Sequence, residues 1–294
     1  MSSAAAERWA ATRSFHHSLY PAERIAAERE VSVSICLPAR ECADTVGAIV
    51  NQLVALRELG AIDEIVVVDA ASADGTAEIA SQAGASVWQE DQLMTSQGKV
   101  LGKGDAMWRA LSRLSGEIIC FLDADSQDFS AHFATGLLGP LLCERGGISF
   151  VKAFYRRPFN EGGLSGRDGG GRVNHLMARP ALGLFYPELA AVRQPLAGEV
   201  AARRELLEAV PFATGYGVEI AMLIDVWRQF GLDAMAQVDL EEHHNRHQPL
   251  SALSPMAATV LATIARRLEE EGRLEGVELA GPLERPPLAG VSVR

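Results

Sequence analysis

The sequence has few cysteines, and none of them is paired in a C-x-x-C spacing. The four are Cys36, Cys42, Cys120 and Cys143. Cys36 and Cys120 lie within apolar, strand-like runs, which is typical of buried thiols that act as small hydrophobic side chains in a reducing compartment. We therefore expect free thiols in a cytoplasmic protein.

Long hydrophobic runs and an excess of positive charge are also missing. No apolar run approaches the roughly 20 residues that a membrane-spanning helix needs. Residues 1–30 are alanine-rich and charged, without the apolar segment of a secretory signal. The 38 acidic and 27 basic residues give a net charge of −11. An acidic surface argues against nucleic acid as the main partner, although a local basic pocket can still bind an anionic substrate. We expect neither a membrane nor a nucleic-acid partner.

What the sequence does contain is an alternation of strands and helices. Its 294 residues, 48% of them hydrophobic, suffice for one large domain or one and a half. Strands are predicted at 31–37, 63–69, 86–88 and 118–122, with helices at 45–59, 76–83 and 105–114 between them. This order predicts a parallel, doubly wound α/β sheet. The first turn lacks a G-x-G-x-x-G sequence, which argues against a dinucleotide-binding fold.

The rest of the chain gives a less regular pattern. We expect residues 4–30 to be helical with a break at Pro21, and Pro38 to end the first strand. Residues 160–172 are glycine-rich and predict a mobile loop, while residues 281–294 predict an irregular tail. Further helices are expected at 132–142, 173–179, 200–207 and 251–271 and beyond residue 217, with strands at 147–158 and 236–240.

An acidic stretch, residues 116–128, organises the first part. Its apolar run ends at Asp123 and Asp125, which point the same way in an extended chain. Carboxylates just past a buried parallel strand lie where open α/β sheets bind ligands. Two such anions repel unless a cation lies between them, and Mg²⁺ or Mn²⁺ often bridges a carboxylate and a phosphate. The alternatives are a metal site that holds a diphosphate and a polar turn whose Asp side chains cap backbone groups.

Other polar residues are predicted to meet this stretch. Arg40, Glu41 and Asp69 also follow strands, so the sheet would bring them to the same edge as the acidic pair, which favours a nucleotide site. Lys103 at a helix start suits a phosphate, although its spacing is not that of a Walker A loop and an exposed lysine is the alternative.

Two later features have a functional and an ordinary interpretation. Arg172 follows the glycine-rich segment at a helix start, where it could clamp a phosphate or carboxylate or form a surface ion pair. His243, His244 and His247 follow a strand and could supply a third metal ligand, or form a surface cluster.

With these residues in view, the chain resembles the retaining glucosyl-3-phosphoglycerate synthases, which are GT-A glycosyltransferases of family 81 together with the mannosyl-3-phosphoglycerate synthases. The resemblance runs from about residue 31 to about residue 261. Its most specific blocks are residues 102–108, 151–158, 169–173, 194–199, 215–220 and 232–238. Several blocks that occur in the same order as in the family are stronger evidence than a lone Asp-x-Asp. The resemblance implies a GT-A fold, Rossmann-like, with a mixed, mainly parallel central sheet.

The resemblance also implies a division of the chain and a set of substrates. Residues 1–30 would be a helical extension, 31–128 the nucleotide-sugar half, 129–250 the acceptor half and 251–294 a C-terminal helix and tail. The enzyme would move glucose from UDP-glucose, or mannose from GDP-mannose, to the 2-hydroxyl of 3-phosphoglycerate, with Mg²⁺ or Mn²⁺. A homodimer is expected, with Trp9 and the apolar stripe from Met256 to Leu268 as candidate contacts.

Site residues follow from the same resemblance. The metal would be bound by Asp125 and His244. The acceptor would be held by Gly171, Arg172, Asn174 and His247. Asp125, Lys103, Glu219 and Arg172 would carry catalysis. The donor would be held by Pro38, Ala39, Glu41, Asp69, Ser72, Lys103, Asp123, Leu196, Tyr216 and Glu219.

The chain departs from the family pattern at a few positions. The donor motif reads Pro38-Ala-Arg-Glu-Cys42, where the family more often has an Asn-Glu pair after Pro-Ala-Leu. Ala197 stands where serine is common, and Asn174 replaces a common threonine. Counting back from Pro249 without a gap puts Asn245 where the family has its metal-binding histidine, and His244 fits with a shift of one residue. The alternatives are an inverting GT-A transferase that acts on a lipid phosphate or polysaccharide, and a non-catalytic nucleotide-binding relative.

Overall fold

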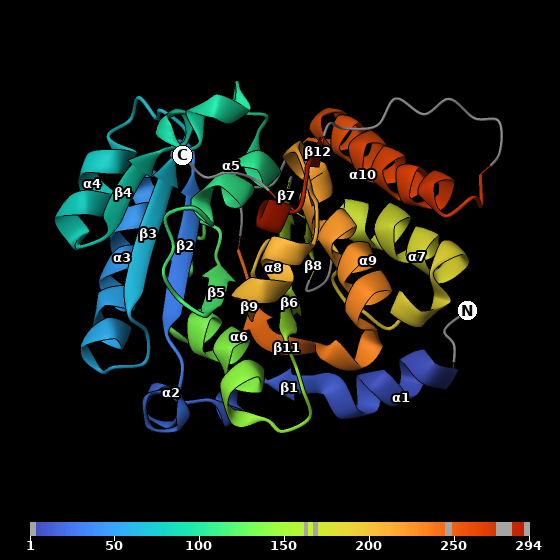
Figure 1. The fold of residues 1–294 in the computed structure, drawn as a ribbon, viewed down its shortest axis with the longest axis horizontal. Coiled ribbons are helices and arrows are strands. Elements are labelled where there is room, and N and C mark those ends of the chain that lie inside the picture. Colours follow the sequence, from blue (N-terminus) through green and yellow to red (C-terminus); the bar gives the residue numbers. More distant parts are fainter. Residues whose placement is uncertain (1–3, 162–163, 167–169, 245–248, 275–283, 291–294) are drawn as a thin grey trace.

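A mixed eight-stranded sheet forms the centre of the protein (Figure 1). The computed structural model describes residues 4–161, 164–166, 170–244, 249–274 and 284–290. The strands run in the order β1-β11-β6-β9-β5-β2-β3-β4. All neighbours pair in parallel except β9, which is antiparallel to both β5 and β6. The expected mixed, mainly parallel sheet is confirmed. The bounds are β1 Ser14–His16, β2 Val33–Ala39, β3 Glu64–Asp69, β4 Ser86–Gln89, β5 Ile118–Phe121, β6 Phe150–Arg156, β9 Val200–Arg203 and β11 Met235–Glu242.

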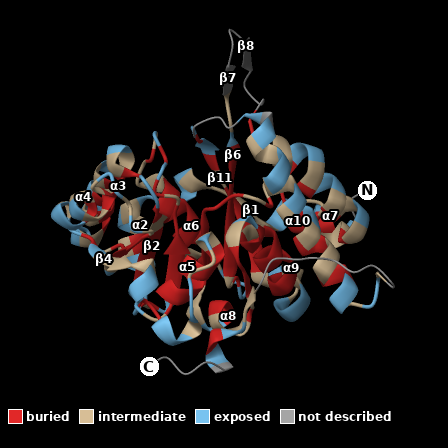
Figure 2. Ribbon diagram, turned by 90° about the horizontal axis from the view of Figure 1, so that it is seen from above, coloured by how far each residue is buried: buried red, intermediate tan, exposed pale blue. Residues whose placement is uncertain are grey.

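Helices cover both faces of this sheet, because its strands are apolar on both sides. In β2, Ile35 and Leu37 belong to one hydrophobic cluster and Cys36 to the other. The first cluster is closed by α2 Ala22–Glu28, α3 Ala43–Glu58, α4 Thr76–Ala83 and α6 His132–Cys143. The second is closed by α1 Ala4–Arg13, α5 Lys103–Ala110, α7 Arg179–Phe185, α8 Arg204–Ala209, α9 Val218–Phe230 and α10 Leu250–Glu270. Figure 2 shows the buried sheet between exposed outer helix faces. Two-sided burial of this kind is what parallel strands require.

Shorter elements complete the chain. The 3₁₀ turns that matter here are η1 His17–Leu19 and η6 Gly215–Gly217, and η4 Asn174–Ala178 is π-helical. β7 Phe159–Glu161 and β8 Leu164–Gly166 pair as an antiparallel hairpin, so part of the glycine-rich segment is not the loop we expected. β10 Phe212–Ala213 pairs with β12 Glu284–Arg285. No helix among the described residues is long and apolar enough to cross a membrane.

The N-terminal segment is only partly helical, contrary to expectation. Ser14–His16 forms β1, which pairs in parallel with β11 at the sheet edge. Three residues are too few to give a periodic pattern, so the sequence could not predict this strand. Trp9 is buried and its indole Nε1 donates a hydrogen bond to the Met235 carbonyl, 2.8 Å away. It is therefore part of the core and not a candidate subunit contact.

The predicted end of one strand and the predicted start of one helix are wrong. β2 continues through Pro38 to Ala39, because the Pro38 nitrogen faces the β5 side, where pairing has already ended at Cys36. Residues 200–203 form β9 and not the start of a helix, and α8 begins only at Arg204. Val200 to Ala202 are buried between β5 and β6, so tertiary pairing overrides the helical preference of alanine.

Residues 284–290, which we expected to form part of an irregular tail, make specific contacts with the rest of the fold. Arg285 of β12 forms an ion pair with Asp105 of α5, with 2.6 Å between Nε and Oδ1, and lies over the Trp108 ring. In α10, Val260, Ile264 and Leu268 are buried within the chain. The apolar stripe is thus part of the core, which removes these three side chains as subunit contacts.

We predict that Arg267→Met destabilises the fold strongly. The Arg267 guanidinium is fully buried between Asp225, at 2.6 Å, and Glu284, at 2.7 Å. Removing it leaves two carboxylates without their common partner, a loss that costs about 3–5 kcal/mol for buried pairs. Arg266→Met is the matched control, because the neighbouring side chain is one-third exposed and should cost less than about 1 kcal/mol. Equal unfolding free energies for both variants in urea would contradict the assignment.

Gly139→Ala is expected to loosen the N-terminal segment from α6. A Cβ at Gly139 would lie 2.0 Å from the buried Tyr20 ring, so the ring must move. Overpacking of this kind costs about 1–3 kcal/mol. Gly183→Ala in α7 is the control, because nothing lies within 4 Å of its added Cβ and alanine favours a helix. The free energy of unfolding should fall for the first variant and not for the second.

Candidate active site

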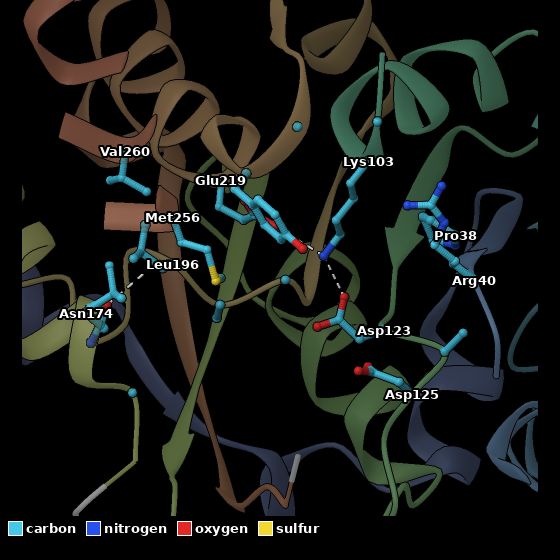
Figure 3. A pocket seen from close by; sticks show the side chains of 18 of the residues that line it. Pro38, Arg40, Lys103, Asp123, Asp125, Asn174, Leu196, Glu219, Met256 and Val260 are labelled. Atoms are coloured by element: carbon cyan, nitrogen blue, oxygen red, sulfur yellow. Dashed lines mark hydrogen bonds and ion pairs between the residues drawn. The ribbon is translucent and has the colours of Figure 1, made fainter. Parts of the chain in front are cut away.

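A cleft of about 630 Å³ opens at the carboxyl ends of β2, β3 and β5 (Figure 3). Parallel pairing aligns Ala39 with Asp69 and Cys36 with Phe121, so the residues that follow these strands reach one edge, as predicted. The cleft brings together eleven of the predicted site residues: Pro38, Ala39, Lys103, Asp123, Asp125, Gly171, Arg172, Asn174, Leu196, Tyr216 and Glu219.

Lys103 occupies the centre of the cleft. Its Nζ lies 2.6 Å from Asp123 Oδ1 and 3.1 Å from Glu219 Oε1, so one ammonium group joins α5, the end of β5 and α9 (Figure 3). Burial alone would lower the pKa of Lys103, but the two carboxylates raise it well above its usual value. The side chain is therefore a fixed positive charge at the place where the chain first enters α5.

Asp125 lies beside this ion pair and is exposed to the cleft. It forms no ion pair with a described residue. Burial of its carboxyl group and the nearby negative charge of Asp123 raise the pKa of Asp125. A divalent cation would relieve this repulsion, and an all-oxygen carboxylate site suits Mg²⁺ or Mn²⁺. The residues present fit such an ion.

His244 is the described histidine that could complete a metal site. Its Nδ1 lies 2.6 Å from Asp128 Oδ2, and its backbone N–H also donates to that carboxylate. A carboxylate on one ring nitrogen orients the other nitrogen toward a metal in many sites. His244 is half exposed and does not line the cleft itself. Asn245 and His247 lie outside the described residues.

Glu41, Asp69 and Ser72 do not line the cleft. Ser72 Oγ accepts a hydrogen bond from the Glu41 N–H, and the Glu41 carboxylate accepts one from the Ala73 N–H, at 2.8 and 3.0 Å. Asp69 Oδ2 accepts from the Ser72 N–H, while its buried Oδ1 has no hydrogen-bond partner among the described residues. The network fixes the backbone of residues 41, 72 and 73 and leaves one buried acceptor unpaired at the end of β3.

Asn174 stands at the far side of the cleft, where the π-helical turn begins. Its amide is engaged at both ends: Nδ2 donates to the Arg193 carbonyl at 3.3 Å, and Oδ1 accepts from the Leu196 N–H at 3.4 Å. It thereby holds residues 193–196 against the cleft. Gly171 and Arg172 line the same side.

A buried network under the cleft floor was not predicted. His243 Nε2 lies 3.1 Å from Glu199 and Nδ1 lies 3.2 Å from Asp128. Burial would lower the pKa of His243, but these two carboxylates raise it to about 9. Tyr155 donates to Glu199 at 2.8 Å, and Arg157 donates to the Tyr155 hydroxyl at 2.8 Å.

Sequence reasoning had named parts of this network without its connections. Tyr155 and Arg157 fall in one of the quoted blocks and Glu199 ends another, but no spacing links them to His243. Arg157 and Met256 also line the cleft, although neither had been predicted as a site residue. Arg40 lines it too, at the sheet edge where its position after the first strand had placed it.

Comparison with known proteins identifies the family. Residues 34–140 match the family described as "Glycosyl transferase family 2". The chain is 40% identical over 269 residues to glucosyl-3-phosphoglycerate synthase of Petrotoga mobilis, which covers 90% of this chain and 82% of the relative. The crystal structure of mannosyl-3-phosphoglycerate synthase from Rubrobacter xylanophilus is 45% identical, with a TM-score of 0.90, covering 97% of this chain and 99% of the other.

A further solved structure contains ligands. It is glucosyl-3-phosphoglycerate synthase from Mycobacterium tuberculosis in complex with Mn²⁺, UDP-glucose and phosphoglyceric acid, 37% identical with a TM-score of 0.80, covering 92% of this chain and 95% of that one. Together with the cleft and its acidic strand end, these similarities show that the chain belongs to the glucosyl- and mannosyl-3-phosphoglycerate synthases, a family of glycosyltransferases with the GT-A fold.

Proposed function

We propose that this protein transfers a hexose from a nucleoside diphosphate sugar to the 2-hydroxyl of 3-phosphoglycerate. The observation that carries the proposal is the Lys103–Asp123–Glu219 cluster beside Asp125, at the edge where a parallel sheet binds nucleotides. The donor is UDP-glucose or GDP-mannose, the two expected from the family.

Asp125 and His244 are proposed to hold a Mg²⁺ or Mn²⁺ ion. When bound, the ion acts as a Lewis acid toward the diphosphate that leaves the sugar. Lys103 adds a second positive charge from the protein side, and its ion pairs keep that charge in place before the donor arrives. An Asp123 carboxylate oxygen contacts the Lys103 ammonium group, so the proposed role of Asp123 is to position the lysine next to the metal site.

The two ends of the donor contact different parts of the cleft. Pro38 and Ala39 would face the nucleoside, while Glu41, Asp69 and Ser72, which do not line the cleft, would fix the backbone around it. Leu196, Tyr216 and Glu219 would contact the sugar. The 13% exposed Glu219 side chain already meets Lys103 at 3.1 Å, so a sugar hydroxyl would bind next to the phosphate-binding charge.

The acceptor is proposed to bind between Gly171, Arg172 and Asn174, with His247 as an additional expected contact. Arg172 and Arg157 both line the cleft, which gives the acidic protein a local basic surface for two anionic groups of the acceptor. Fixing the acceptor hydroxyl near the donor sugar lowers the entropic cost of their reaction. A homodimer and the halves 31–128 and 129–250 as donor and acceptor parts remain predictions from the family.

We expect turnover with 3-phosphoglycerate, Mg²⁺ or Mn²⁺ and one of a panel of nucleotide hexoses. Asp125→Asn should lower kcat/KM at least about 100-fold, because several kcal/mol of charge stabilisation are lost. Asp233→Asn is the control, since this exposed carboxylate lies in the 3₁₀ turn Leu232–Ala234, just before β11, and is outside the cleft. Released nucleoside diphosphate and the anomeric configuration of the product by NMR are the readouts. A lack of turnover with every donor would overturn the proposal.

Gly198→Ala tests the placement of Asp123. An added Cβ would lie 2.5 Å from both Asp123 carboxylate oxygens, so this carboxylate must leave Lys103. We expect kcat to fall about 10- to 100-fold, which corresponds to about 1.4–2.7 kcal/mol. Gly183→Ala, which meets no atom within 4 Å, should keep full activity. Wild-type activity in Gly198→Ala would contradict a role for the Asp123–Lys103 pair.

A further inference from the structure

A second group of metal-ligand side chains lies away from the cleft, where β1 meets the end of β11. It consists of His16, His17 and Glu241, whose ligand atoms all lie within 4.8 Å of one another. His16 is the last residue of β1, His17 begins η1 directly after it, and Glu241 lies in β11, the strand that pairs with β1 at one edge of the sheet. None of them lines the cleft or belongs to the site described above.

Two distances within this group are close to those between neighbouring ligand atoms of a small tetrahedral ion. His16 Nε2 and His17 Nε2 lie 3.6 and 3.4 Å from Glu241 Oε1. Zn²⁺ with bonds of about 2.0–2.1 Å to nitrogen and oxygen sets neighbouring ligand atoms about 3.3 Å apart. Two imidazoles with one carboxylate form a ligand set that Zn²⁺ accepts, with water in the fourth position.

Hydrogen bonding explains the group less well than a shared ion does. The His17 Nε2 atom is buried and has no hydrogen-bond partner among the described residues, so its approach to Glu241 lacks hydrogen-bond geometry. His16 Nδ1 lies 2.7 Å from Ser18 Oγ, and donation to that hydroxyl leaves Nε2 free to bind a cation. The Ser18 amide donates to the same Nδ1 at 3.2 Å, so binding of a cation at Nε2 requires the tautomer in which the ring proton has moved from Nε2 to Nδ1 and is donated to Ser18 Oγ.

The surrounding chain holds the three side chains in place. Glu241 has a φ of +69°, which is costly for a residue with a Cβ, and it lies within the register shift of β11 between Asp239 and Glu242. His132 stacks on His17 with 4.1 Å between ring centroids, and its Nε2 lies 3.2 Å from the Leu240 carbonyl. A strained backbone position that turns a carboxylate toward two histidines is the kind of outlier that functional sites retain.

We propose that His16, His17 and Glu241 bind a zinc-class divalent cation that fastens β1 to β11. Binding requires the Nε2 lone pairs of the two neutral rings and the Glu241 carboxylate. The ion would stabilise the folded chain, because its ligands come from segments more than two hundred residues apart and the unfolded chain offers no such site.

The test measures metal content and thermal stability in the Asp125→Asn protein, without nucleotide, so that it does not depend on catalysis. After dialysis against micromolar Zn²⁺, we expect one ion per chain by mass spectrometry of the metal and a rise in Tm of a few degrees. Substitution of Co²⁺ should give the visible absorption bands of a tetrahedral site.

Matched variants localise the ion. Glu241→Gln and His17→Ala should lose the ion and the rise in Tm, while Glu242→Gln and His175→Ala, which change a neighbouring carboxylate and an exposed histidine, should keep both. If His17→Ala fails to fold, His16→Asn on the half-exposed ring replaces it. No zinc uptake by the parent, or equal uptake by Glu241→Gln and Glu242→Gln, would overturn the proposal.

Discussion

The site depends on one ammonium group held between two carboxylates. Lys103 contacts Asp123 at the end of a central strand and Glu219 at the start of a helix on the other side of the cleft. Because Asp123 and Glu219 are held by different elements, the position of the Lys103 ammonium group depends on how α5, β5 and α9 pack together. The free-energy cost of desolvating the Lys103 ammonium group is offset by these carboxylates during folding, before a donor diphosphate binds. This is the condition for electrostatic preorganisation.

Two glycines next to this cluster leave space that a side chain would fill. Gly104 would place a Cβ 1.9 Å from the Ala213 carbonyl, so α5 can approach β10 this closely only without a side chain there. Gly198 leaves the space that the Asp123 carboxylate fills. Close backbone approach, and not flexibility, is what these two positions require.

The sequence predicted the parts of the fold that follow from local pattern. The apolar runs of β2, β3 and β5 and the helical spacing of α3 were sufficient, because each is a regular element buried on a consistent face. β9 could not be predicted, since Val200 to Ala202 form a strand only because β5 and β6 lie on both sides of them. The carboxylates at the strand ends were likewise predictable from parallel topology. The partners of His243 were not, because Glu199 and Asp128 reach it from distant parts of the chain.

The placement of β9 and β1 also determines when the sheet can be completed during synthesis. β5 keeps an unpaired edge until residues 200–203 have been made, although it precedes them by about eighty residues. β1 waits longer still, because its partner is β11 near residue 238. A nascent chain therefore carries open strand edges through most of its translation, and such edges are where chains associate wrongly. This topology is therefore more vulnerable to wrong association while the chain is being synthesised than after folding is complete.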